Sequence, residues 1–215
     1  GTPPALVQVG NEISDGLLWD PANCSNGGQI SCDGGGHYDN MVRLLQAGIN
    51  GVRAVMGPPE QYGGVVLHLA NGQNTDQVAT WYREATSRGL SGFDHLGISY
   101  YQRWGGSRCG VAALPAQLAA LAALTEGEGR RILVAETDYP FTPPEDGSGS
   151  WPEPPEFAFT ADGQAAFLQA ILDVLRANAT RSSGLFWWGA ELRQGYSGAR
   201  TGLWDTSGQE LPAVR

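Results

Sequence analysis

The sequence lacks any apolar stretch near the roughly 20 residues that a membrane-spanning helix needs, so we expect no contact with a bilayer. Its start also lacks a basic segment followed by an apolar one, and no signal peptide is expected there. Positive charge is scarce, with 13 Lys and Arg against 22 Asp and Glu and a net charge of -9. Such a field repels polyanions, which argues against a nucleic-acid partner, whereas a neutral polysaccharide is compatible with it.

Motifs for nucleotides and metals are also absent. No Gly-rich phosphate-binding loop follows any apolar run, so no nucleotide cofactor is expected. The three Cys and three His do not have the spacing of a zinc site, and no metal is expected. Cys24 and Cys32 flank a short polar loop. They are either bonded, as in a secreted protein, or two free thiols, and Cys109 is left over.

The sequence does contain an alternation of short apolar runs with amphipathic segments. Asn74 is expected to cap one helix, with Gln77 in the capping-box position, and Gly48 to end another. Strands are predicted at 5–12, 65–70, 94–101, 130–136 and 184–189, and helices at 39–49, 75–88, 114–124 and from Thr160 to Ala177. Strict alternation favours an α/β fold with a parallel sheet in one domain over 1–215, either an open doubly wound sheet or a barrel.

Five strands are too few to close the usual eight-stranded barrel of about 250 residues, so a barrel would lack three βα units in this chain. The Pro/Gly-rich segment 140–157 lies between a predicted strand and the helix that follows it. We therefore interpret this segment as a long βα loop over the site rather than as a linker between domains.

Two glutamates, Glu12 and Glu136, close predicted strands. Strands of one parallel sheet point the same way, so both carboxyls are expected on one face, and glycoside hydrolysis uses such a pair. Either Glu alone could instead be an ordinary strand-end acid that caps a helix or meets an Arg. Asn11 beside Glu12, with Tyr100 and Trp188 at other strand ends, favours the glycosidase interpretation.

Longer motifs resemble one known family. The segment VQVGNEISDGLLW at 7–19 resembles the strand-four motif of glycoside hydrolase family 53, the arabinogalactan endo-β-1,4-galactanases, and AETDYP at 135–140 resembles its strand seven. DHLGISYYQRWGG at 94–106 and GLFWW at 184–188 resemble its strands six and eight. The similarity runs through the whole chain. It implies a (β/α)₈ barrel represented here by strands four to eight, and retaining cleavage of β-1,4-galactan by a secreted protein that is a monomer when complete.

The resemblance also implies roles for residues. Glu12 would be the acid/base and Glu136 the nucleophile, with their carboxyls about 5–5.5 Å apart. Asn11 would bind the sugar 2-hydroxyl. Tyr100 or Tyr101 would orient the nucleophile, and strand alternation makes Tyr100 the preferred choice. Other expected substrate contacts, each also interpretable as a packing residue, are His68, Trp19, Trp104 and Trp188. His37 is expected in a loop and His95 in a structural role. Asp138 and Asp146 are expected in solvent, with contact to substrate as the alternative.

After FWW the chain departs from the family pattern. It reads GAELRQGYSGAR, where many members have Glu-Pro and a longer loop that binds calcium in some bacterial relatives. We therefore predict no calcium site. Two alternatives to a galactanase remain open: another glycosidase of the same clan, such as a cellulase or mannanase, and a non-catalytic sugar-binding barrel fragment.

Overall fold

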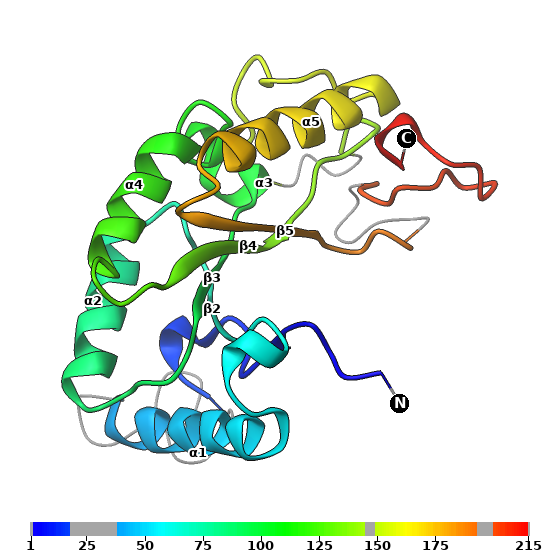
Figure 1. The fold of residues 1–215 in the computed structure, drawn as a ribbon. Coiled ribbons are helices and arrows are strands. Elements are labelled where there is room, and N and C mark those ends of the chain that lie inside the picture. The colour runs from blue at the N-terminus through cyan, green and yellow to red at the C-terminus, as the bar shows by residue number, and fades with distance from the viewer. Residues whose placement is uncertain (1, 18–37, 145–148, 193–199, 215) are drawn as a thin grey trace, which may run out of the picture. The chain divides into compact units, whose positions relative to one another are not determined.

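The computed structural model describes residues 2–17, 38–144, 149–192 and 200–214, so Trp19, Cys24, Cys32, His37 and Asp146 lie outside the described residues. Five strands form one sheet in the order β1-β2-β3-β4-β5 (Figure 1). Their bounds are β1 Val7–Gln8, β2 Val65–Leu69, β3 His95–Ser99, β4 Arg131–Thr137 and β5 Ser182–Trp187. The helices are α1 Tyr38–Met56, α2 Thr75–Ser87, α3 Gln102–Gly105, α4 Leu114–Leu124 and α5 Ala161–Ala177.

The chain forms two compact units. The first comprises Gly1–Ile98 with Leu121–Ile132, and the second comprises Ser99–Ala120 with Leu133–Arg215. No single helix among the described residues is long and apolar enough to cross a bilayer, and one bent pair, Gln102–Cys109 with Leu114–Leu124, passes that test by length and composition alone.

In the first unit β1, β2 and β3 pair in parallel, with Val7 opposite Val65 and Val66 opposite His95. Every residue of β2 is buried, as expected of a central parallel strand. Helices α1 and α2 contact each other, and α1 buries Met41, Val42, Leu45 and Ile49 along one face.

The predicted cap of α2 is confirmed, because the Gln77 N–H donates to Asn74 Oδ1 at 3.2 Å. The prediction that Gly48 ends α1 is wrong, since the helix continues to Met56. A Cβ at Gly48 would lie 2.7 Å from Val9 Cγ1. Glycine at this position therefore allows close packing of helix on strand, while Gly57, with φ of 75°, follows the helix end.

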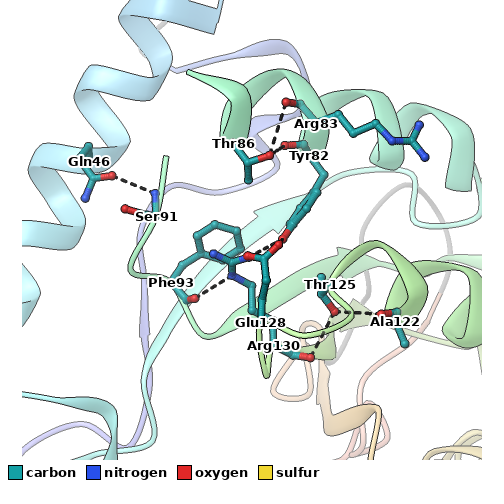
Figure 2. Close-up of polar contacts among 10 residues, drawn as sticks. All are labelled: Gln46, Tyr82, Arg83, Thr86, Ser91, Phe93, Ala122, Thr125, Glu128 and Arg130. Atoms are coloured by element: carbon teal, nitrogen blue, oxygen red, sulfur yellow. Dashed lines mark hydrogen bonds and ion pairs between the residues drawn. The ribbon is translucent and has the colours of Figure 1, made fainter. Parts of the chain in front are cut away.

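Arginines stabilise the end of the first unit where its strands begin. Arg130, just before β4, places its guanidinium carbon 4.0 Å from the Phe93 ring centroid and pairs with Glu128 and Tyr82 (Figure 2). Arg53 pairs with Asp94 at 2.5 Å, and Asp94 accepts the Val65 N–H at 2.7 Å. In barrel enzymes this end serves stability, and the opposite, carboxyl-terminal end carries the chemistry.

In the second unit α5 buries Phe167, Ile171 and Leu175. The predicted start of α5 is confirmed, because the Gly163 N–H donates to Thr160 Oγ1 at 3.0 Å. The described parts of the loop after β4 contain no helix or strand and pack on their own unit. Tyr139 stacks on Phe167 at 4.5 Å and contacts Trp151 edge-on at 5.6 Å.

Candidate active site

In the first unit, the chain turns sharply before Glu12. The last backbone bond to the sheet is Val9 N–H to Val66 O at 2.9 Å, and Gly10 then takes φ of 82°. Strand β1 therefore ends at Gln8, and the prediction of a strand through Glu12 is wrong. Glu12 itself has φ 47° and ψ 49°, in the left-handed region. A non-glycine residue held there costs about 1–2 kcal/mol, and such strain is concentrated at functional sites.

The strain at Glu12 gives a testable prediction for stability. We expect Glu12→Gly to be more stable than Glu12→Ala by about 1 kcal/mol, because glycine adopts the left-handed conformation without a Cβ clash. Thermal or urea unfolding of the two variants measures the difference. Asp15, in the 3₁₀ turn Ile13–Asp15, supplies the control. There we expect Asp15→Ala to be more stable than Asp15→Gly. If the same substitution, Gly or Ala, gives the more stable variant at both positions, the prediction is contradicted.

Asn11 lies beside Glu12 with its side-chain amide held in one orientation. Its Oδ1 accepts from Gln8 Nε2 at 3.0 Å and lies 3.1 Å from His68 Nδ1. An oxygen facing the His68 nitrogen requires a proton on that nitrogen, which defines the tautomer of the ring. The Nδ2 group of Asn11 is then directed away from these partners as a hydrogen-bond donor.

His68 is fully buried on β2. Burial lowers the pKa of His68 to about 4, against a smaller raising effect of the Glu12 carboxylate. The ring is therefore neutral in ordinary buffers and acts as a donor from Nδ1 rather than as a cation. His95, in contrast, contacts the Gly63 carbonyl at 2.9 Å at the start of β3, so its predicted structural role is confirmed.

In the second unit, Glu136 is half-buried near the end of β4. The Tyr101 hydroxyl donates to Glu136 Oε2 at 2.7 Å, and burial is the main reason that the pKa of Tyr101 is raised. The preference for Tyr100 as the residue that orients Glu136 is wrong. Tyr100 has no exposed surface, and its hydroxyl donates to the Gly110 carbonyl at 2.9 Å.

The reason for this error is the extent of β3, which ends at Ser99. Alternation of side chains holds only inside a strand, so it does not decide between Tyr100 and Tyr101. Tyr101 is the N-cap residue of α3, with φ -108° and ψ 114°. The doubled tyrosine in the sequence indicates that one of the two contacts Glu136, but strand alternation does not show which.

Substitutions of the two tyrosines are expected to differ in their effects on kcat and on folding free energy. We expect Tyr101→Phe to lower kcat roughly 10- to 100-fold, because a hydrogen bond to a carboxylate contributes about 1.5–3 kcal/mol. Tyr100→Phe should leave kcat near wild type and cost about 1 kcal/mol of folding free energy, since its hydroxyl serves a buried carbonyl. Steady-state kinetics and thermal unfolding of both variants measure this. A larger kcat loss in Tyr100→Phe would contradict the assignment.

Asp138, two residues beyond Glu136, is 1% exposed, so the expectation that it is solvated is wrong. Its carboxylate forms an ion pair with Arg103, which is itself 4% exposed. The residues next to Asp138 in the sequence do not indicate this ion pair, because Arg103 is 35 positions away.

The aromatic residues of the second unit differ in exposure. Trp104 is 51% exposed on α3. Trp188 is half-buried just after β5, and its backbone N–H donates to the Thr137 carbonyl at 2.9 Å. Trp187, one position earlier, packs on Phe167 of α5 at 6.5 Å. Trp104 therefore presents an aromatic face to solvent, as a sugar-binding residue would.

Metal ligands do not gather anywhere within the described ranges: no three His, Cys, Asp or Glu side chains there are placed to hold an ion. Cys109 is buried, and burial raises the pKa of its thiol to about 12, so it is not a nucleophile at neutral pH.

Solved structures identify the class of protein. A structure from a report on two fungal β-1,4-galactanases matches 98% of the chain with a TM-score of 0.77 and 26% identity, and the chain covers 60% of it. An intracellular xylanase from Thermoanaerobacterium saccharolyticum matches 94% with a TM-score of 0.56 at 15% identity, which bears on the fold alone. The predicted fold is confirmed: the five strands and their helices correspond to part of the (β/α)₈ barrel of these glycosidases.

Sequence comparison identifies the family. The family model for glycosyl hydrolase family 53 matches residues 1–215, so the chain belongs to that family and the predicted resemblance is confirmed. A probable arabinogalactan endo-β-1,4-galactanase A of Aspergillus flavus is 32% identical over 197 residues, which is 85% of this chain and 48% of the relative. The arabinogalactan endo-β-1,4-galactanase of Thermothelomyces thermophilus is 27% identical over 221 residues, covering all of this chain and 61% of the relative. The chain thus spans about half to three-fifths of the length of these relatives.

Proposed function

We propose that the protein hydrolyses internal β-1,4-galactosidic bonds of galactan or arabinogalactan with retention of configuration. Membership of family 53 supports this activity, as do the activities for which the relatives are named. The observation that carries the proposal is the hydrogen bond from Tyr101 to Glu136, because a strand-end carboxylate held in one rotamer by a hydroxyl is prepared to attack a sugar.

Glu136 is the proposed nucleophile. Its carboxylate attacks the anomeric carbon, the bond to the leaving oxygen breaks, and a covalent galactosyl ester forms. Tyr101 holds the attacking carboxylate in place and keeps its second oxygen directed at the sugar.

Glu12 is the proposed acid/base. It gives its proton to the leaving oxygen in the first step, then accepts one from the water that releases the sugar. Its left-handed backbone supports this role, since strain of this kind needs a functional reason to persist.

The substrate contacts are also proposals. Asn11 donates from Nδ2 to the sugar 2-hydroxyl, and His68 keeps the amide in the orientation that allows this. Trp188 and Trp104 offer aromatic faces to pyranose rings, and Trp19 is proposed for an outer subsite.

The protein as a whole is proposed to act on β-1,4-galactan outside the cell, as a monomer in a single catalytic domain, without a cofactor or metal. Its negative charge, with 22 acids against 13 bases, suits a neutral substrate and disfavours nucleic acid. The chain spans 48% to 61% of the relatives cited, so this activity is proposed for the natural gene product.

Release of reducing ends from linear β-1,4-galactan, carboxymethylcellulose and mannan tests the proposal in the natural gene product. We expect galactan alone to be cut, into oligosaccharides rather than galactose only. Cleavage of cellulose or mannan would indicate another glycosidase of the same clan. Binding to galactan without turnover would indicate a sugar-binding fragment.

A further inference from the structure

A buried ion pair lies next to the proposed nucleophile, and the chemistry described so far does not use it. Arg103 and Asp138 have side chains exposed by only 5% and 1%. Burying two charges is costly, and their mutual attraction often fails to repay that cost. The pair is therefore poorly explained by stability alone, and its position invites a functional explanation.

We propose that the Arg103–Asp138 pair positions the substrate-contacting side chains of the second unit, holding Tyr101 against Glu136 and Trp104 toward the sugar. This inference rests on the proposed function, because it assigns a device to the same site. Neither residue is proposed to touch the reacting atoms, and both act through Tyr101 and Trp104.

The contacts of the guanidinium carry the argument. The central carbon of Arg103 lies 5.1 Å from the ring centroid of Tyr101 and 5.5 Å from that of Trp104, within cation–π range of both. Asp138 restrains the guanidinium through the ion pair with Arg103 Nη2. The Arg103 guanidinium thus contacts both aromatic rings. The hydroxyl of Tyr101 is hydrogen-bonded to Glu136, and Trp104 is half exposed to solvent.

The backbone around Arg103 limits alternative positions of this group. The Ser150 N–H donates to the Arg103 carbonyl at 2.5 Å, and a Cβ at Gly149 would lie 2.9 Å from that same oxygen. The loop after β4 therefore holds α3 at the residue that carries the cation. Movement of the guanidinium must come from its side chain, which Asp138 restrains.

The charge on Asp138 should respond to pH. Burial raises the pKa of Asp138 to about 7, while Arg103 and the Thr201 hydroxyl act in the lowering direction and Glu136 in the raising direction. The second unit contains no histidine, and burial holds the pKa of Cys109 at about 12. As pH falls through about 7, Asp138 gains a proton and Arg103 loses its counter-charge.

The test compares wild type with Asp138→Asn and Arg103→Lys in the natural gene product. Asn is an uncharged isostere that matches protonated Asp138, so the two enzymes should agree at low pH and separate above pH 7. We expect the ratio of wild-type to Asp138→Asn kcat/KM on galactan to rise from near 1 at pH 5 to about 10 at pH 8. Ionisations common to both enzymes cancel in this ratio.

Arg103→Lys keeps the charge but not the flat guanidinium, so it should release both rings. We expect a lower kcat through Tyr101, a higher KM through Trp104 and a melting temperature close to wild type. The exposed pair Arg176–Asp173 on α5, with side chains 65% and 62% exposed, supplies matched controls. Arg176→Lys and Asp173→Asn should leave kinetics unchanged at every pH.

A second measurement does not require activity. The emission of Trp104, obtained as the difference between each protein and its Trp104→Phe counterpart, should change around pH 7 in wild type. That change should vanish in Asp138→Asn. If Asp138→Asn does not fold, as circular dichroism would show, an altered Trp104 emission in folded Arg103→Lys supports the proposal, and an unaltered one overturns it.

The outcomes separate this proposal from the proposed function. A pH-independent kinetic ratio together with unchanged Trp104 emission overturns the positioning role, even if galactan is cleaved. Absence of galactan cleavage by wild type overturns the proposed function. The emission change and its loss in Asp138→Asn would still show that the pair positions Trp104.

Discussion

Glu136→Gln is expected to lower kcat on β-1,4-galactan by about 10⁴-fold or more, because the amide cannot attack the anomeric carbon. The substitution preserves size, and Tyr101 can still donate to the remaining carbonyl oxygen, so folding should be unaffected. Glu126→Gln, at an exposed position after α4, is the matched control and should behave as wild type. Reducing-end assays and thermal unfolding of both variants measure the effect.

Azide gives a sharper form of the same experiment. In Glu136→Ala an added azide ion can enter the vacated space and attack in place of the carboxylate, so a single displacement should give the α-galactosyl azide from an activated aryl galactoside. Retention by the intact enzyme, seen as an initial β-anomer, completes the test. Recovery of the β-azide from Glu136→Ala, or turnover within about tenfold of wild type in Glu136→Gln, would contradict the nucleophile assignment.

Glu12→Gln is expected to separate the two chemical steps. Galactan turnover should fall by about 10³-fold, because its leaving oxygen needs a proton. A dinitrophenyl β-galactooligosaccharide needs no such help, so its kcat/KM should stay near wild type. Release of the sugar still requires a base, so kcat should fall and a burst of dinitrophenol should precede a slow steady state.

The control for Glu12→Gln is Asp15→Asn, an exposed carboxylate three residues further on. It should change neither substrate's kinetics. Azide added to Glu12→Ala should accelerate the slow step and give the β-galactosyl azide, the opposite anomer to that expected from Glu136→Ala. An equal loss of kcat/KM on both substrates would contradict the acid/base role.

Local signals in the sequence predicted those elements that depend on neighbours along the chain. Asn74 caps its helix as expected, and Thr160 marks the expected start of α5, because an N-cap bond involves residues only three positions apart. The strand Val65–Leu69, apolar except for His68, is identifiable because a central parallel strand is buried on both faces. The α/β class follows from the alternation of apolar runs with amphipathic segments, and the barrel follows from the family motifs.

The errors arose where distant residues decide the structure. The sequence predicts a helix end at Gly48, but the glycine is explained by its close packing on Val9, which is 39 positions away in the chain. Asp138 was expected in solvent because nothing near it in sequence indicates Arg103. At position 12 the sequence predicts a candidate catalytic carboxyl but not the left-handed backbone of Glu12, which comes two residues after the positive φ of Gly10.

The two glycines inside α1 differ in their tolerance of change. At Gly51 a methyl group would meet no atom within 4 Å, so alanine there should strengthen the helix by about 1 kcal/mol. At Gly48 the same methyl group would press on Val9, three residues ahead of Glu12. Gly51→Ala is therefore open to protein engineering for heat resistance, whereas Gly48→Ala is expected to displace Val9 and, through it, Glu12, the proposed acid/base.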